Sequence, residues 1–366
     1  MASSAFNINS ERKYSVAVGM SGGVDSSVAA AKLVEAGHCV FGFTLRLFDH
    51  DPAVDVSVFP DPVKDAAAVC AELGIPHHVV DLRAEFHHEI MDYFEREYMA
   101  GRTPNPCVHC NSRIKWAKLW NKAQAYGIER ISTGHYARID LNTRGDVCLR
   151  RGADQLKDQS YFLWELPRKL LALTFFPLGD MTKTEVREYA SAKNLPVAER
   201  SESQEVCFIP NNDYRAWLLN RRPDLANGEL KGEMVNQAGD VIGRHEGFPF
   251  FTIGQRKGLG LGGGKKYYVT NIDPKTRRVQ LGEETQLVQN ELTIHSINRL
   301  QDRPYDGSNE YEVKIRYRDP GFPAVVERRS DDTLTICSTH PIRSVTPGQS
   351  AVIYDGDTVV AGGIIR

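Results

Sequence analysis

A glycine-rich loop near the start of the chain joins its first apolar segment to its first helical one. The loop reads Ser21-Gly22-Gly23-Val24-Asp25-Ser26-Ser27, after the apolar run 15–19 and before a helix-like stretch at 26–36. Two adjacent glycines allow positive φ and a close approach of the backbone. Backbone N–H groups in such a loop, together with a helix N-terminus, favour a bound anion. We therefore predict a nucleotide phosphate site between a strand and a helix of an α/β domain.

Strand and helix signals alternate through the first third of the chain. Short apolar runs predict strands at 15–19, 39–43, 77–80 and 130–133, and helices are expected at 26–36, 61–74, 85–100 and 113–126. This alternation predicts a doubly wound parallel sheet, in which ligands bind at the carboxyl ends of the strands. The glycine-rich loop follows one such end. Asp25 is expected to cap the helix after it or to help hold Mg²⁺.

Beyond this region, the residue pattern and the glycine content of the chain change. A hairpin is expected over 136–150 around Gly145, and Thr182 with Glu185 forms a capping-box pattern that opens a helix to Asn194. After about residue 211 glycine becomes frequent and short alternating runs dominate, which predicts a small β-barrel at the C-terminus. We expect three domains: 1–211 with the phosphate loop, a small central domain at 212–285, and the C-terminal barrel at 286–366.

Composition narrows the class of protein. The 366 residues carry a net charge of −2, so a polyanion would need a local basic face, and basic residues do recur at 256–278 and 314–318. No apolar run is long enough to span a bilayer, and the first fourteen residues contain no apolar signal-peptide core. We expect a cytoplasmic protein without a membrane partner. Seven cysteines, an odd number in a chain of this size, argue against a disulfide framework.

Three of the cysteines differ from the rest. Cys107 and Cys110 form a C-x-x-C pair in a proline-rich stretch, and Cys207 lies in another loop-like segment. The prolines predict an extended loop, followed by a helix whose N-terminal end favours a thiolate. Four interpretations are open: inert thiols, a structural zinc site, a redox pair, and sulfur transfer with or without an iron–sulfur cluster. Zinc would need a fourth ligand, and His109, between the paired cysteines, is poorly placed to serve.

The glycine-rich loop resembles the PP-loop of the ATP pyrophosphatases, and longer strings resemble one family, the tRNA-specific 2-thiouridylases. These strings run in order from about Tyr14 to the C-terminus, at 19–27, 101–106, 133–136, 157–163, 254–260 and 345–351. The resemblance implies an adenine nucleotide α-hydrolase-like domain that cleaves ATP between its α and β phosphates with Mg²⁺. It implies a sulfurtransferase acting on the wobble uridine of glutamate, glutamine and lysine tRNAs. The partners would be tRNA and a sulfur donor, either sulfide or a cysteine desulfurase with its sulfur relay.

The resemblance also implies roles for individual residues. The nucleotide would lie against ten of them: Gly19, Met20, Ser21, Gly22, Gly23, Val24, Asp25, Ser26, Leu45 and Gly134. The tRNA would contact a second set: Asn105, Pro106, Cys107, His135, Lys157, Asp158, Gln159, Arg316, Tyr317 and Gln349. Cys207 would carry a persulfide, and Cys110 would release its sulfur and form a disulfide with Cys207.

One residue departs from the family pattern. Well-known members carry aspartate where this chain has Cys107, and a thiol cannot simply inherit acid–base work from a carboxylate. Cys107 instead completes a set of three cysteines, with Cys110 and Cys207, of the kind with which related tRNA thiolases hold a 4Fe–4S cluster. Two mechanisms therefore stay open: a persulfide on Cys207 resolved by Cys110, or a cluster held by all three cysteines.

Two functions of other classes compete with RNA thiolation. A small-molecule ATP pyrophosphatase of the synthetase or amidotransferase type would use the same phosphate loop, but it would leave the three cysteines and the β-rich tail unexplained. A nucleotide-sensing or RNA-binding module with structural zinc would bind metal without converting ATP to AMP.

Overall fold

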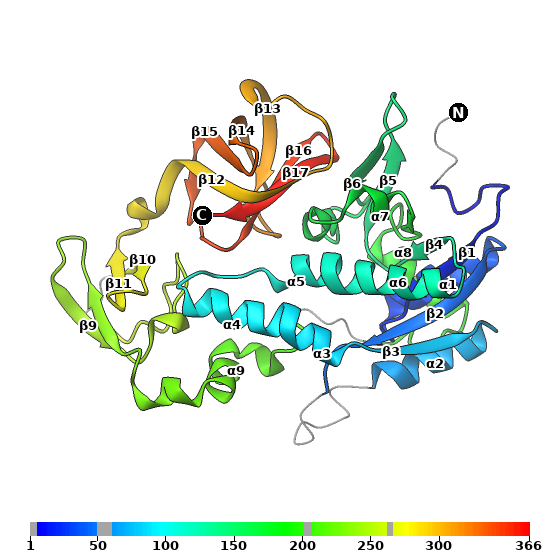
Figure 1. Cartoon of the computed structure of the whole chain (residues 1–366), viewed down its shortest axis with the longest axis horizontal. Coiled ribbons are helices and arrows are strands. Elements are labelled where there is room, and N and C mark those ends of the chain that lie inside the picture. The colour runs from blue at the N-terminus through cyan, green and yellow to red at the C-terminus, as the bar shows by residue number, and fades with distance from the viewer. Residues whose placement is uncertain (1–5, 50–60, 201–205, 262–265) are drawn as a thin grey trace.

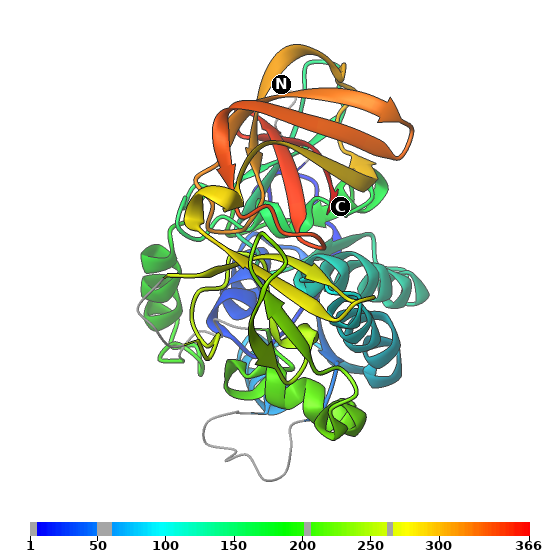
Figure 2. The same cartoon turned by 90° about the vertical axis from the view of Figure 1, so that its left-hand side faces the viewer.

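The computed structural model describes residues 6–49, 61–200, 206–261 and 266–366. Three parts follow one another along the chain: an α/β domain, a small sheet preceded by a helix, and a β-barrel (Figure 1). In the view turned by 90°, the small sheet lies in front of the α/β domain and below the barrel (Figure 2). The chain thus folds back on itself, and C-terminal segments reach the first domain.

The α/β domain is built on a parallel sheet of order β3-β2-β1-β4-β7. Its strands are β1 Ser15–Gly19, β2 Cys39–Arg46, β3 His77–Asp81, β4 Arg130–Ser132 and β7 Thr174–Phe175. Side chains of β1 alternate between two cores. Val16 and Val18 share one with α1 (Val24–Glu35), and Ala17 shares the other with α6 (Ala117–Ala125). Both faces of the strand are therefore buried, which confirms the predicted doubly wound sheet.

The predicted helices are present with shifted bounds, and two of them consist of several helical segments in series. α2 spans Pro62–Glu72 with Asp61 as its N-cap, and α8 spans Lys183–Ala192 with the predicted capping box. The third predicted helix runs as α3 Arg83–Phe86, η2 His87–Met91 and α4 Asp92–Met99. The fourth runs as α5 Pro106–His109, η3 Cys110–Trp116 and α6. Short helical turns, η4 Ser160–Leu163 and α7 Arg168–Leu171, follow before β7.

The segment with Cys107 and Cys110 contradicts the predicted extended loop. Pro106 is the first residue of α5, a position where no intrahelical N–H bond is lost and where the fixed φ of proline suits a helix. Cys107 therefore lies in α5, and Cys110 begins the wider turns of η3. The non-helical connection from α4 is confined to residues 100–105.

Six strands close into a C-terminal barrel, as predicted. They are β12 Val288–Arg299, β13 Asp306–Lys314, β14 Phe322–Ser330, β15 Thr333–Arg343, β16 Ser350–Asp355 and β17 Thr358–Ile365. The ladder runs β12-β15-β14-β13-β16-β17 and closes because β12 also pairs with β17. The predicted hairpin, β5 Ala137–Leu141 and β6 Val147–Arg151, joins this sheet where Arg150 pairs with Thr358. The α/β domain thus extends the barrel sheet.

The middle of the chain contains α9 (Tyr214–Arg221) and a four-stranded sheet of order β10-β11-β8-β9. Its strands are β8 Gly232–Val235, β9 Val241–His245, β10 Tyr268–Asp273 and β11 Arg278–Gly282. The domain boundaries at 211 and 285 stay predictions. Within the described ranges, no helix combines the length and the apolar character needed to cross a membrane.

A substitution at Gly362 in β17 tests how the barrel packs against the first domain. A Cβ at this position would lie 2.5 Å from Cγ and Cδ2 of Trp164, whose ring is fully buried. We expect Gly362→Ala to lower the free energy of unfolding by about 1–3 kcal/mol, because a buried ring has no room to move aside. The measurement is a urea unfolding curve beside Gly356→Asn, a control in the same hairpin whose φ of +57° asparagine tolerates. Equal stability of the two variants would contradict this packing.

Candidate functional site

The glycine-rich loop turns tightly between β1 and α1. Gly22 has a φ of +71°, and a Cβ there would lie 2.8 Å from the carbonyl oxygen of Pro62, so the turn requires glycine. The hydroxyls of Ser26 and Ser27 both donate to the carbonyl oxygen of Gly23, at 3.1 and 2.9 Å. The first N–H groups of a helix have no partner within it, so this geometry offers donors to a phosphate.

Gly134 packs against the loop from the side. It follows β4, and a Cβ there would lie 2.6 Å from the backbone of Asp25 and Ser26. The structure therefore brings Gly134, predicted to line the nucleotide, into contact with the glycine-rich loop. Leu45, the other distant member of that set, is half-buried near the carboxyl end of β2.

Asp25 does not cap α1, contrary to one of its two predicted roles. The N-cap is Gly23, which has no side chain, and no side-chain capping hydrogen bond is present. The Asp25 carboxylate instead accepts hydrogen bonds from Tyr136 Oη at 2.7 Å and from Lys183 Nζ at 2.6 Å. This pair brings an ammonium group to the loop, on a side chain that is only 12% exposed. Sequence analysis missed Lys183. The capping box at Thr182 was the available signal, because it fixes Lys183 as the first residue of a helix.

The three cysteines share one electrostatic neighbourhood. Cys110 is buried, Cys107 is half-buried, Cys207 is exposed, and all are free thiols. Burial raises the pKa of Cys110 to about 11. Cys207 touches solvent, yet the protein packed around it, with Cys110 and Cys107, raises the pKa of its thiol to about 12. Lys115 opposes the rise at all three, but the expectation that the site favours a thiolate is wrong for the free protein.

Lys115 also connects the cysteines to the nucleotide side of the site. Burial lowers the pKa of His135 well below its usual value, and the Lys115 ammonium lowers it further. His135 Nδ1 lies 2.9 Å from Thr133 Oγ1, and its ring centroid is 5.1 Å from that of Trp116 in η3. Because His135 follows Gly134, one short segment touches both the phosphate loop and the helical turn that begins with Cys110.

The three cysteines do not form a ready-made zinc site in the described part of the chain. Tetrahedral zinc, at about 2.3 Å from each sulfur, would hold the sulfurs about 4 Å apart. In the described part of the chain, the one group of three ligand atoms from His, Cys, Asp or Glu within 4.8 Å of one another is His87, His88 and Asp92.

The group of His87, His88 and Asp92 is a hydrogen-bond network. Arg221 Nη1 lies 3.0 Å from His87 Nε2, and a guanidinium can only donate, so this nitrogen is the acceptor. The ring proton is then on His87 Nδ1, which faces Asp92 Oδ1 at 3.4 Å and cannot ligate a metal. The network joins η2 and α4 to α9.

His109, between the two paired cysteines in sequence, pairs with Glu165. Its Nδ1 lies 2.8 Å from both carboxylate oxygens, and Ser112 Oγ donates to the same carboxylate at 2.6 Å. Burial alone raises the pKa of Glu165, but the hydrogen bond and charge of His109, with Ser112 and Arg113, outweigh it and lower the pKa. This pair braces α5 and η3 against the segment 160–165. Local sequence patterns do not show it, because 56 residues separate the partners.

Two residues predicted to contact tRNA are bonded inside the protein. The Asp158 carboxylate accepts from the backbone N–H groups of Gly152 and Ser160, each at 3.0 Å. Gln159 Oε1 accepts from the backbone N–H of Tyr136 at 3.0 Å. Asp158 is buried, so its side chain supports this turn. A direct contact of either residue with RNA stays a prediction.

Other members of the tRNA set lie where the α/β domain meets the barrel. Gln349 Nε2 donates to the carbonyl oxygens of Thr103 at 2.9 Å and Pro104 at 3.1 Å. The rings of Tyr317 and Phe162 lie 4.6 Å apart, one from the barrel and one from the α/β domain. Three further members are exposed or half-buried: Asn105, Lys157 and Arg316.

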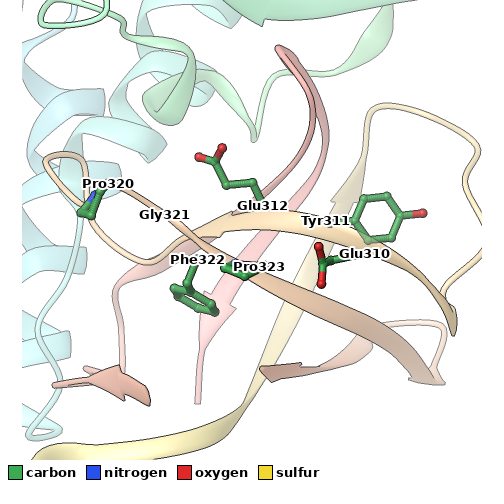
Figure 3. A pocket seen from close by; sticks show the side chains of 7 residues that line it. All are labelled: Glu310, Tyr311, Glu312, Pro320, Gly321, Phe322 and Pro323. Atoms are coloured by element: carbon green, nitrogen blue, oxygen red, sulfur yellow. The ribbon is translucent and has the colours of Figure 1, made fainter. Parts of the chain in front are cut away.

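A pocket on the barrel lies outside this set of residues (Figure 3). Its lining comes from β13, β14 and the turn between them: Glu310, Tyr311, Glu312, Pro320, Gly321, Phe322 and Pro323. Glu312 accepts from Arg151 Nη2 at 2.6 Å. Two carboxylates in its lining disfavour a polyanion, so the pocket has no evident part in binding RNA.

Comparison with known proteins shows one family over the whole chain. Three family models match, described as tRNA methyl transferase HUP domain at residues 14–211, tRNA methyl transferase PRC-barrel domain at 225–283, and aminomethyltransferase β-barrel domain at 289–365. The tRNA-specific 2-thiouridylase MnmA of Salinibacter ruber is 43% identical over 363 residues, 97% of this chain and 95% of that protein. This chain belongs to the tRNA-specific 2-thiouridylase family. The MnmA of Carboxydothermus hydrogenoformans is likewise 43% identical, over 96% of this chain and 97% of its own.

Solved structures overlap the chain in part. The U34-tRNA thiolase NcsA from Methanococcus maripaludis, with its 4Fe–4S cluster, is 18% identical with a TM-score of 0.34, over 59% of this chain and 68% of that chain. A 4-thiouridine synthetase in complex with RNA and ATP is 18% identical with a TM-score of 0.36, over 58% of this chain and 52% of that chain. The family assignment therefore rests on the sequence comparisons.

The Glu165–His109 pair gives a pH-dependent prediction. The pKa of Glu165 is lower in the folded protein than its ordinary value of 4.5, so its ionised form stabilises the fold above that pH. We expect Glu165→Gln to lower the free energy of unfolding near neutral pH by about 1–3 kcal/mol. The difference should shrink as the pH falls from 4.5 through the lowered pKa of the folded protein, where the wild-type carboxylate also becomes neutral.

Urea unfolding at neutral and acidic pH measures this difference, with the exposed Glu188→Gln as the control. A difference between wild type and Glu165→Gln that is the same at both pH values would show that the ionised pair does not brace the helix.

Proposed function

We propose that this protein catalyses the ATP-dependent 2-thiolation of the wobble uridine of tRNA in the cytoplasm. Besides family membership, the position of Lys115 supports this. Its ammonium acts on the thiols of Cys107, Cys110 and Cys207 and on His135, the residue after Gly134 at the glycine-rich loop. A nucleotide loop and a sulfur site beside one cation suit a reaction in which ATP activates an oxygen and sulfur then replaces it.

The first step activates the uridine. Its O2 oxygen attacks the α-phosphorus of ATP, the bond to the bridging oxygen breaks, and pyrophosphate leaves with Mg²⁺. The N–H groups of the loop and the ammonium of Lys183 are suited to stabilise the charge that develops on pyrophosphate. His135 is neutral near pH 7, because burial lowers its pKa, so it can donate a hydrogen bond without adding charge.

The second step replaces the activated oxygen with sulfur. A sulfur nucleophile attacks C2, the new C–S bond forms as the C–O bond breaks, and AMP leaves. In the persulfide route, Cys110 attacks the inner sulfur of the Cys207 persulfide, and the outer sulfur passes to C2. The resulting Cys110–Cys207 disulfide is then reduced by an external thiol. A sulfur relay protein is the proposed source of the persulfide.

In the cluster route, Cys107, Cys110 and Cys207 would hold a 4Fe–4S cluster, and the cluster would supply a site that binds inorganic sulfide. The three thiols fit this role because they lie in one neighbourhood without the closeness that a zinc ion requires. Lys115 compensates the negative charge that three thiolates would bring.

The small-molecule ATP pyrophosphatase is the weaker hypothesis. It accounts for the loop and for Lys183, but it gives no task to the cysteine site or to the contact between Gln349 and residues 103–104. Conversion of ATP to AMP without any dependence on tRNA would favour it.

Thiolation of unmodified glutamate tRNA tests the proposal and separates the two sulfur routes. Protein purified without oxygen is incubated with Mg²⁺-ATP and sulfide or a sulfur relay, and 2-thiouridine, AMP and iron are measured. We expect Cys110→Ser and Cys207→Ser to abolish 2-thiouridine in both routes, because each uses both thiols. Cys107→Asp decides between them: the persulfide route survives this change without iron, and the cluster route loses iron and activity together.

Failure of the wild-type protein to form 2-thiouridine, with iron present and with a complete sulfur relay, would remove the proposed function.

Lys183 should act on the adenylation step. We expect Lys183→Met to reduce tRNA-dependent AMP and pyrophosphate formation about 10²-fold or more, because it removes a positive charge from the loop while keeping the apolar stem. Lys193→Met is the matched control, since that ammonium pairs with Glu35 on the exposed end of the same helix. Equal rates for the two variants, with unchanged melting temperatures, would show that Lys183 is not part of the phosphate site.

A further inference from the structure

The connection between α4 and α5 leads directly into the helix that carries Cys107 and Cys110, formed by α5 and η3 and called here the cysteine helix. Segments from all three parts of the chain hold this connection. From the barrel side, the N–H of Thr103 donates to the carbonyl oxygen of Pro347 at 2.9 Å. From the central part, a Cβ on Gly101 would lie 2.9 Å from Pro274 Cγ. Thr103 Oγ1 also lies 3.3 Å from Thr252 Oγ1. Residues 101–104 are thus packed where the three parts meet.

Gln349 makes the most specific of these contacts. Its side-chain amide carries two N–H bonds, and Nε2 lies 2.9 Å from the carbonyl oxygen of Thr103 and 3.1 Å from that of Pro104. Both donors of this amide therefore have protein acceptors. An RNA group can still reach Oε1, but it cannot use an N–H of Gln349 without displacing one of these bonds.

The backbone around Gln349 is fixed by the barrel. The N–H of Gly348 donates to the carbonyl oxygen of Ile365 at 2.9 Å, and the N–H of Ile365 donates to the carbonyl oxygen of Gln349 at 2.8 Å. These two bonds hold the turn against the end of β17. Gly348 has a φ of +91°, and a Cβ there would lie 2.9 Å from the carbonyl oxygen of Thr103. The barrel turn and the segment before α5 are therefore in backbone contact, with no room for a side chain between them.

We infer that Gln349 is a positioning residue that clamps residues 103–104 and thereby fixes the first turn of the helix with Cys107 and Cys110. Through it the barrel completes the cysteine site even when no RNA is bound. The inference rests on the proposed function only in assigning a reaction to those cysteines. It differs from the predicted role of Gln349 as a contact of tRNA, because a clamp acts in the free protein.

Alkylation of Cys110 in the free protein, without ATP or tRNA, tests the clamp. Iodoacetamide labelling is followed by peptide mass spectrometry, and the exposed Cys39 in the same sample is the internal reference. We expect Gln349→Ala to label buried Cys110 about tenfold faster, because two hydrogen bonds that oppose local opening are lost. Labelling of Cys39 should not change, and the exposed Gln289→Ala should match wild type at both cysteines.

Gly348→Ala supplies a second, independent variant. A methyl group here pushes on the carbonyl oxygen of Thr103, while the side chain of Gln349 keeps every atom that an RNA could contact. We expect faster labelling of Cys110 in this variant too, with a melting temperature that shows the barrel still folded. In the thiolation assay, both variants should lower kcat and change the KM for tRNA less than about twofold, as a positioning role requires.

Wild-type labelling of Cys110 in both variants, with a raised KM for tRNA in Gln349→Ala alone, would overturn the clamp and leave Gln349 as an RNA contact. The labelling result does not depend on catalysis. If the wild-type protein failed to thiolate tRNA, the proposed function would fall while the clamp would still be decided by the labelling rates.

Discussion

The site depends on one close approach, between the end of β4 and the start of α1. Gly134 lies so near the backbone of Asp25 and Ser26 that no side chain fits between them. That contact sets the glycine-rich loop against the segment that continues to His135, whose ring lies beside Trp116 of η3. Two adjacent residues after β4, Gly134 and His135, therefore contact the glycine-rich loop and the cysteine helix respectively. A parallel sheet makes this arrangement available, since the carboxyl ends of its strands lie at one edge.

The charged side chains of the site are held in ion pairs, although the net charge of the whole chain is only −2. Lys183 is held at the loop by Asp25, and His109 is held by Glu165, so a cation lies on one side of the site and an ionised carboxylate braces the other. The Lys115 ammonium acts on both sides of the site, because it lowers the pKa of Cys110 and that of His135. Such paired charges keep their positions without requiring a basic protein, and a polyanion can then be recognised locally.

Local patterns in the sequence predicted the elements that depend on local physics. The alternation of apolar runs predicted the doubly wound sheet, Thr182 and Glu185 predicted the start of α8, and Gly145 marked the β5–β6 hairpin. The same reasoning failed at residues 106–111, because Pro106 was interpreted as a breaker although proline also suits the first position of a helix. The partners of Asp25, His109 and Gln349 could not be predicted. They lie 158, 56 and 246 residues away, and only the folded chain brings them together.

The segment 160–165 links the barrel to the cysteine helix by hydrogen bonds at both of its ends. At its start, Ser160 Oγ lies 3.2 Å from Tyr354 Oη, and Tyr161 Oη donates to the carbonyl oxygen of Ser350 at 2.9 Å, both on β16. At its end, Glu165 holds His109. A displacement of β16 would therefore reach α5 by two routes, through this segment and through residue 349, which directly precedes the strand. Two supports on one helix constrain both its position and its rotation, as the proposed alignment of three thiols with a nucleotide and a base would require.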